Sequence, residues 1–203
     1  TLTCNDYWGL DVTPYASLTV EHGTYEHKGG TSYGYTGTAI QANKVKEAGP
    51  GCTVTIESDA TIKTDGDAVL CQGYNTVNVY GKIYSVSNGI FGSGPCNKVT
   101  LDGAYIESEN YAVYQNPYSK TFTFERKGST YTIKDSTIIA GNDDPGVYLF
   151  NYTGIATSNH TLTIENSKIS ADIGVYLSCT DATIKGENTK IEYTNTAGNS
   201  VYF

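Results

Sequence analysis

Two pairs of aspartates are the residues of this sequence best placed to do chemistry. Asp143 and Asp144 are adjacent in GNDDPG, whereas Asp65 and Asp67 flank a glycine in TDGDA. Paired carboxylates hydrolyse glycosidic bonds when they flank the scissile bond, and carboxylates also bind Ca²⁺. Both pairs nevertheless lie in contexts typical of turns, one before Pro-Gly and the other around glycine, and two carboxylates are too few for calcium. We therefore predict turn roles for both pairs.

Two histidines, His22 and His27, lie in EHGTYEHKGG, each directly after a glutamate. Histidine and glutamate can bind metals. The two histidines are five residues apart, however, and this spacing would not place their rings on the same face of a helix or of a strand. The chain also shows no nucleophile elbow, phosphate-binding loop or catalytic triad. We predict no metal site and no cofactor.

Five cysteines are spread along the chain: Cys4, Cys52, Cys71, Cys96 and Cys179. None forms a CxxC pair, which disfavours a zinc site. Buried thiols in a core and disulfides of an exported protein both remain open, and the sequence does not reveal a pairing.

The composition disfavours two classes of partner. The formal net charge is −8 and Arg126 is the single arginine, so the chain lacks the basic stripe that nucleic-acid binding requires. No apolar run approaches the roughly 18 residues of a membrane helix. We predict neither a nucleic-acid partner nor a membrane span. The sequence starts at Thr1 without a signal peptide, which we interpret as a mature N-terminus or an excised fragment.

A repeat organises most of the chain. Segments that begin at Cys52, Asn75, Asn97 and His160 share one order of parts. The first part is a strand with two alternating apolar residues, followed by a short turn. The second part is a strand that contains an isoleucine. The third part is a strand with a small residue, an aliphatic residue and usually an aromatic residue in succession. Such alternation is typical of half-buried strands. A unit of this kind cannot bury its apolar face alone, but stacked units can.

This repeat resembles the right-handed parallel β-helix proteins of the pectate-lyase-like superfamily, and more closely the repeat regions of large bacterial surface and secreted proteins. The resemblance covers roughly residues 16–203 and rests on the periodic pattern. It implies an all-β fold, a right-handed parallel β-helix (β-solenoid) of about seven coils of 20–23 residues with insertions at one corner. We expect residues 1–15 to form an N-terminal cap or incomplete coil, with Trp8 covering the core. Residues 16–203 would be the β-helix, whole or a segment of a longer solenoid.

The enzymes of that superfamily degrade acidic polysaccharides, but their catalytic motifs are not matched here. Lyases of the pectate type use a basic residue with Ca²⁺ held by aspartates, whereas Arg126 falls in an insertion rather than on a coil strand. Polygalacturonase-like hydrolases combine clustered aspartates with Gly-His-Gly and Arg-x-Lys, and the last two motifs are absent. We therefore predict a protein that is not an enzyme, with a polysaccharide lyase or glycoside hydrolase as the alternative.

An outward-facing aromatic rank is the main candidate for binding. The position after the third-strand aliphatic holds, in successive units, Gln41, Leu70, Phe91, Tyr114, Tyr148, Tyr176 and Tyr202. Tyrosine offers a large contact area and a hydroxyl, which suits sugars and protein partners. A stacking ladder that only stabilises the solenoid is the alternative. Small residues precede the aliphatic, and we expect them to leave room at a corner for the rings.

A second outward rank consists mainly of threonines, among them Thr55, Thr100, Thr132 and Thr163. Flat threonine arrays on β-solenoids can bind ice. Charged residues in the neighbouring ranks would disrupt an ordered water layer, which disfavours that function.

Insertions gather beside the tyrosine rank. QNPYSKTFTFERKGS (115–129) and LFNYTGIATSNH (149–160) both leave the coil directly after it, and they add Tyr118 and Tyr152 to the candidate surface. Inserted loops of solenoids often gather on one functional face. A third insertion, residues 21–37, is expected to add Tyr25, Tyr33 and Tyr35 near the N-terminal end.

Together these features predict an extracellular β-solenoid of a bacterial cell surface, either an adhesin or a structural protein. It would recognise a host protein or a glycan through Phe91, Tyr114, Tyr118, Tyr148, Tyr152, Tyr176 and Tyr202. A filament subunit that assembles end to end is a further alternative. The sequence identifies neither the ligand, nor the source, nor the oligomeric state.

Overall fold

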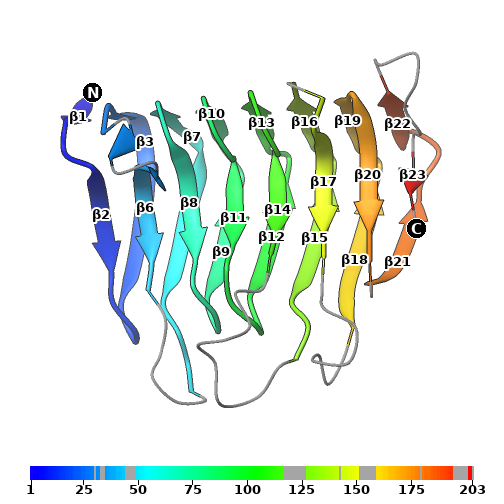
Figure 1. The fold of residues 1–203 in the computed structure, drawn as a ribbon, viewed down its shortest axis with the longest axis horizontal. Coiled ribbons are helices and arrows are strands. Elements are labelled where there is room, and N and C mark those ends of the chain that lie inside the picture. The colour runs from blue at the N-terminus through cyan, green and yellow to red at the C-terminus, as the bar shows by residue number, and fades with distance from the viewer. Residues whose placement is uncertain are drawn as a thin grey trace.

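The computed structural model describes residues 1–29, 31–32, 35–43, 49–116, 127–141, 143–150, 159–178, 180–193 and 201–202. Within these ranges all regular structure is β-strand, and the strands stack side by side along one long axis (Figure 1). Nowhere in the described part of the chain is there a helix long and apolar enough to cross a membrane.

Two parallel sheets contain nearly all the strands. The larger sheet has two arms, because the long strands β3 (Ser17–His27) and β7 (Thr53–Thr64) contribute to both. The first arm continues from them with β9 (Thr76–Val79), β12 (Lys98–Asp102), β15 (Thr130–Lys134), β18 (His160–Glu165) and β21 (Thr180–Lys185). The second arm contains β1 (Leu2–Cys4), β10 (Lys82–Ser85), β13 (Tyr105–Ser108), β16 (Thr137–Ala140), β19 (Lys168–Ala171) and β22 (Lys190–Tyr193).

The smaller sheet lies beside these arms. Its order is β2 (Trp8–Val12), β6 (Thr38–Ala42), β8 (Asp67–Cys71), β11 (Ile90–Gly92), β14 (Val113–Gln115), β17 (Pro145–Leu149), β20 (Ile173–Leu177) and β23 (Val201–Tyr202). A short antiparallel pair, β4 (Thr31–Ser32) and β5 (Tyr35–Thr36), stands apart. Successive strands of the chain therefore join the first arm, the second arm and the smaller sheet in turn. This order confirms the predicted all-β parallel architecture and is consistent with a β-solenoid.

The inward ranks predicted from the repeat pair with one another as expected. Ile56 pairs with Val79, and Val79 pairs in turn with Leu101 on the next strand. The rank continues in register through the first arm. Ile62 and Ile83 are partners in the second arm, and each of these side chains is fully buried. Since alternate side chains of a strand point to opposite faces, the inward ranks fill the space between the sheets, and the first arm contributes two of them, which begin with the pairs Val54–Val77 and Ile56–Val79.

A buried polar ladder fixes the corner where each coil enters the first arm. The backbone N–H of one coil donates to the side chain of the next: Cys52 to Asn75 Oδ1 (3.0 Å), Asn75 to Asn97 Oδ1 (3.3 Å), Asn97 to Ser129 Oγ (3.0 Å) and Ser129 to His160 Nδ1 (2.9 Å). These turn amides lie outside the strand pairing, so the side chains satisfy donors that burial would otherwise leave without a partner.

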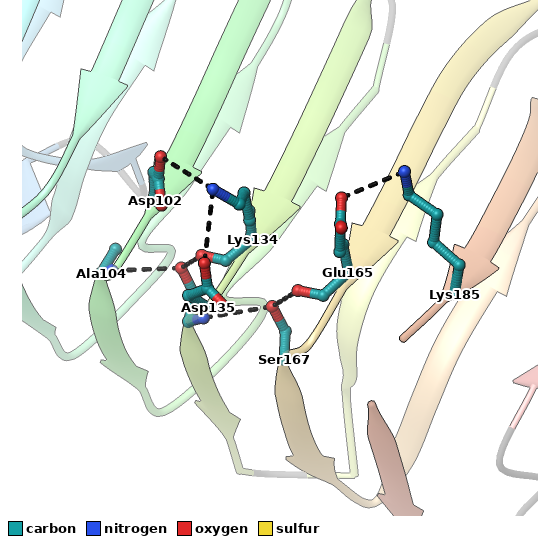
Figure 2. Close-up of polar contacts among 8 residues, drawn as sticks. Asp102, Ala104, Lys134, Asp135, Glu165, Ser167 and Lys185 are labelled. Carbon is teal, nitrogen blue, oxygen red and sulfur yellow. Dashed lines mark hydrogen bonds and ion pairs between the residues drawn. The ribbon is translucent and has the colours of Figure 1, made fainter. Parts of the chain in front are cut away.

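Serines do the same at the corner between the two arms. Ser136 Oγ accepts the Ala104 N–H and Ser167 Oγ accepts the Ser136 N–H, each at 3.1 Å. Figure 2 shows this corner together with the exposed charges beside it, where Lys134 reaches Asp102 (4.0 Å) and Lys185 reaches Glu165 (3.1 Å). Exposed pairs of this kind contribute about 0.2–1 kcal/mol each, so the hydroxyl ladder matters more than the charges.

The small residues before each third-strand aliphatic have a different role from the one expected. Ala68 and Ala112 are fully buried, and a Cβ on Gly89 would lie 2.5 Å from the Ala112 carbonyl and 2.6 Å from Ile106 Cγ2. They are small because the corner is tight against the second arm, and they do not make room for outward rings.

Two N-terminal expectations are wrong. Tyr25, assigned to an insertion, lies in β3, pairs with Ile62 and is 3% exposed, because a bulge after Val20 lets the strand continue into the second arm. Trp8 does not cover the core: the residue is 50% exposed, and its ring meets that of Tyr7 edge to face with the centroids 4.6 Å apart. Residues 1–15 contribute β1 and β2, one strand each to the second arm and the smaller sheet.

Two of the cysteines are core thiols. Cys52 and Cys71 are buried and form no disulfide within the described chain, and burial raises the pKa of the Cys52 thiol to about 11. Cys4 is a half-buried thiol without a disulfide partner among the described residues. Cys179 lies outside the described ranges.

Candidate functional site

The aromatic rank forms a continuous column on the outer face of the smaller sheet. Phe91 pairs with Tyr114, Tyr114 with Tyr148, and Tyr148 with Tyr176 on the adjacent strands β11, β14, β17 and β20. Parallel strands lie about 4.8 Å apart, so rings at one register position must contact their neighbours. The structure thus brings together four of the seven predicted residues.

The other predicted positions are less fully defined. The backbone of Tyr202 pairs with that of Tyr176, while its side chain falls outside the described part. Tyr118 and Tyr152 lie wholly outside the described residues. At the N-terminal end of the column, Leu70 is only 7% exposed, so it belongs to the buried part rather than to the surface.

The rings of the column are arranged as two stacked pairs. Phe91 and Tyr114 are nearly parallel, with centroids 5.1 Å apart and an interplanar angle of 9°, and so are Tyr148 and Tyr176, at 4.7 Å and 11°. Between the pairs, Tyr114 meets Tyr148 edge to face at 5.4 Å and 67°. Each such contact contributes about 0.5–1.5 kcal/mol beyond burial, so the column stabilises the stack whether or not it binds a partner.

Stacking also determines what the column presents to solvent. The ring faces lie largely against neighbouring rings, and all four side chains are half-buried rather than fully exposed. A partner would therefore meet ring edges and tyrosine hydroxyls. Packing of a sugar against an open ring face, one of the roles expected from the sequence, has little room here.

Two further aromatic residues widen the column where its two halves meet. The Tyr111 ring lies 4.4 Å from that of Tyr114 and 5.3 Å from that of Tyr148, and the Phe150 ring lies 6.2 Å from that of Tyr148. Sequence reasoning missed both because they lie just outside the strands, where the period of two no longer predicts direction. We call Phe91, Tyr111, Tyr114, Tyr148, Phe150 and Tyr176 the aromatic surface.

A carboxylate borders this aromatic surface. Asp144 accepts a hydrogen bond from the Tyr111 hydroxyl, and the pKa of Tyr111 is raised by burial and by this bond. The pKa of Asp144 is raised chiefly by burial and further by the charges of Asp143 and Asp172, against the opposing effect of Tyr111. Asp143 donates its N–H to Asp172 Oδ2 at 2.8 Å. The turn role predicted for Asp143 and Asp144 fits this geometry, but the contact with the aromatic surface was not foreseen.

Two of the other residues considered for chemistry, Asp67 and His27, have structural partners. Asp67 is buried and accepts hydrogen bonds from Ser87 Oγ (2.7 Å) and the Asn88 N–H (3.1 Å). His27 is buried between Thr64 Oγ1 (3.0 Å) and the Asp6 carbonyl (2.8 Å), whereas His22 is exposed. The described residues contain no group of three or more potential metal ligands. Arg126 lies outside the described ranges.

Comparison with known proteins adds no family to these observations: no family model, curated protein or solved structure matches the chain.

His160 ties the edge of the aromatic surface to the polar ladder and should make stability depend on pH. Its Nδ1 accepts the Ser129 N–H, so Nε2 carries the proton and donates to the Phe150 carbonyl at 3.2 Å. Burial lowers the pKa of the imidazole below its ordinary 6.5. The unfolded chain therefore takes up the proton first, and stability that is full above about pH 6.5 falls as the pH drops toward the folded pKa.

The matched variant is His160→Asn, because asparagine occupies the equivalent ladder positions at Asn75 and Asn97. Urea unfolding between pH 7.5 and 5.5 should show a wild-type loss of up to about 1.4 kcal/mol, because this range reaches about one pH unit below the unfolded pKa of 6.5, and the variant should lose less. The contribution of Asp144 to the pH dependence of stability has the opposite sign, since its raised pKa favours the folded state as the pH falls. This contribution is the same in both proteins and cancels when they are compared. Parallel pH profiles for the two proteins would contradict this assignment.

Proposed function

We propose that the chain is an extracellular binding or structural protein of a bacterial surface that recognises a partner through the aromatic surface. The observation that supports this is the continuous aromatic surface itself, which spans four adjacent strands and remains half-exposed. The fold proposed is a right-handed parallel β-helix of about seven coils, of the pectate-lyase-like kind, since parallel crossovers are overwhelmingly right-handed. Its role is proposed to be non-enzymatic.

The ring geometry favours a protein partner over a glycan. Sugars pack their C–H groups against open ring faces, whereas each ring of the column has one face covered by a stacked neighbour. Ring edges, tyrosine hydroxyls and the Asp144 carboxylate instead suit the mixed apolar and polar surface of a folded protein. Tyrosine is also among the residues that dominate binding energy at protein interfaces.

The test is the triple variant Tyr114→Ala/Tyr148→Ala/Tyr176→Ala. Surface plasmon resonance against purified extracellular host proteins should show binding by the wild-type chain that weakens about 100-fold or more in the triple variant, because each truncation of a central tyrosine costs more than about 1 kcal/mol. A glycan array run in parallel reports on the glycan alternative and on polysaccharide ligands.

A matched control removes the same residue type from another face. Tyr84 and Tyr105 form a ring pair 5.6 Å apart on the outer face of the second arm, and Tyr84→Ala/Tyr105→Ala should leave binding within about twofold of wild type while reporting any loss of ring-pair stability. Equal binding by wild type and the triple variant, with both folded by circular dichroism, would refute the proposal.

A further inference from the structure

A small pocket of about 250 Å³ lies where β10 and β13, neighbours in the second arm, lead into the turns toward the smaller sheet (Figure 1). Its lining includes Tyr84 and Ser85 of β10, Val86 directly after them, and Glu107 and Glu109 from the next coil. The pocket is smaller than the roughly 300–1,000 Å³ of sites that enclose drug-sized ligands. It therefore suits a single unbranched side chain or a small molecule rather than a large cofactor.

Two carboxylates give the pocket negative charge. Glu107 and Glu109 lie two residues apart at the end of β13, and both are exposed. Glu107 Oε2 accepts a hydrogen bond from the Tyr105 hydroxyl at 2.8 Å. Because an ionised carboxylate offers about four acceptor sites, Glu107 keeps the capacity to accept a further donor. This part of the lining favours a cationic ligand that carries hydrogen-bond donors.

An aromatic ring and an exposed aliphatic side chain complete the wall. Val86 is 46% exposed, and Tyr84 is half-buried between Lys63 on the preceding strand and Glu107 on the following one. Lys63 Nζ lies over the Tyr84 ring, 5.8 Å from its centroid, so the chain itself places an ammonium group against this ring. Alkyl stems pack on apolar surfaces of this kind while their charged heads reach polar groups.

A buried hydroxyl in the lining has no hydrogen-bond partner. Ser85 is 7% exposed, and its Oγ finds no partner among the described residues. The hydroxyls that pair with it in register, one coil before and one coil after, are both satisfied. Thr64 Oγ1 accepts the Gly66 N–H at 3.0 Å, and Ser108 Oγ donates to the Asn110 carbonyl at 3.1 Å. A buried polar group without a partner is costly, so this coil holds an acceptor that a bound donor can satisfy.

From this lining we infer that the pocket binds the primary ammonium group of an alkylamine, either a free amine or the lysine side chain of a polypeptide. A primary ammonium has three N–H donors, which match the two carboxylates and the Ser85 hydroxyl, while its alkyl chain packs against Val86 and Tyr84. A guanidinium is planar and a quaternary ammonium has no N–H, so neither matches these three acceptors. The pocket shares no lining residue with the aromatic surface, so this inference does not rest on the proposed function.

NMR titration of the isotope-labelled full chain tests the chemistry of the ligand. N-acetyl-lysine methylamide should shift the amide signals of Val86 and Glu109 saturably. The norleucine compound keeps the alkyl chain without the charge and should cause no saturable shift. The trimethyllysine compound keeps the charge without the donors and should bind about fivefold more weakly or worse. Pentylamine distinguishes the two sources: binding as tight as that of the lysine compound indicates a free amine, whereas weaker binding indicates a polypeptide.

Two matched double variants locate the site. Glu107→Gln/Glu109→Gln should weaken binding of the lysine compound about tenfold or more, because both charges that face the ammonium are lost. Glu57→Gln/Glu165→Gln removes two half-exposed carboxylates of the first arm and changes the net charge equally, and it should bind within about twofold of wild type. Ser85→Ala should weaken binding about threefold or more. Unchanged binding by either pocket variant, equal weakening by the two double variants, or saturable binding of the norleucine compound would overturn the inference.

Discussion

Asn97→Ala is expected to lower the free energy of unfolding by about 3–5 kcal/mol, which is a severe loss for a single substitution. The side chain is 1% exposed and makes four hydrogen bonds. Its Oδ1 accepts the N–H groups of Gly73 (3.2 Å) and Asn75 (3.3 Å), and its Nδ2 donates to the carbonyls of Cys71 (3.3 Å) and Gly94 (2.8 Å). Alanine leaves the N–H groups of Gly73 and Asn75 buried without this acceptor, and each such loss costs about 1–3 kcal/mol. The Cys71 and Gly94 carbonyls lose one bond each but keep those from the Ser93 N–H and from Gln115 Nε2.

The measurement is equilibrium urea unfolding, with Asn78→Ala as the control. Asn78 lies in the outward threonine rank of the first arm and is half-exposed, so its truncation should change stability by about 0.5 kcal/mol or less. An Asn97→Ala loss no larger than that of the control would show that water replaces the side chain and that the polar ladder is not a main stabilising element.

Gly89→Val is expected to cost about 3 kcal/mol or more, because overpacking at a rigid site exceeds the usual range. The first added carbon would already lie 2.5 Å from the Ala112 carbonyl oxygen and 2.6 Å from Ile106 Cγ2. Relief requires the coils of Gly89 and Ala112 to separate, which would weaken the bonds from Gly89 N–H to Tyr111 O (3.0 Å) and from Ile90 N–H to Ala112 O (2.9 Å).

Gly141→Val is the matched control, since a Cβ there meets nothing closer than the Glu109 carbonyl at 3.4 Å. Thermal unfolding followed by circular dichroism should show a much lower midpoint for Gly89→Val and little change for Gly141→Val. Similar midpoints for the two variants would mean that the corner next to Ile106 is more adaptable than its contacts indicate.

Strand positions could be predicted from the sequence because their signal is local. The alternation at Val54 and Ile56 and the isoleucine at Ile62 specify which side chains point inward, and the observed register agrees. The same alternation placed Phe91, Tyr114, Tyr148 and Tyr176 in one outward rank. It failed at Tyr25, because β3 has one residue fewer than β7 after Val20, which reverses the set of side chains that points inward.

Several features of the candidate site could not be predicted in this way. Tyr111 and Phe150 reach the aromatic surface from turns, where direction depends on how the next coil passes. The orientation of the rings depends on contacts between coils, so the sequence could not show that Tyr148 and Tyr176 cover each other's faces. Nor could it show that Asp144, one of a turn pair, is hydrogen-bonded to Tyr111.

The amino-acid pattern alone specifies the all-β class, the stacked repeat and the inward and outward ranks, because these follow from a period of two within each strand. The three-dimensional contacts were needed to show what lies at the corners. Asn97 satisfies amides of the preceding coil, and Gly89 is confined by the following one. Each depends on residues more than twenty positions away, so neither is encoded in a local pattern.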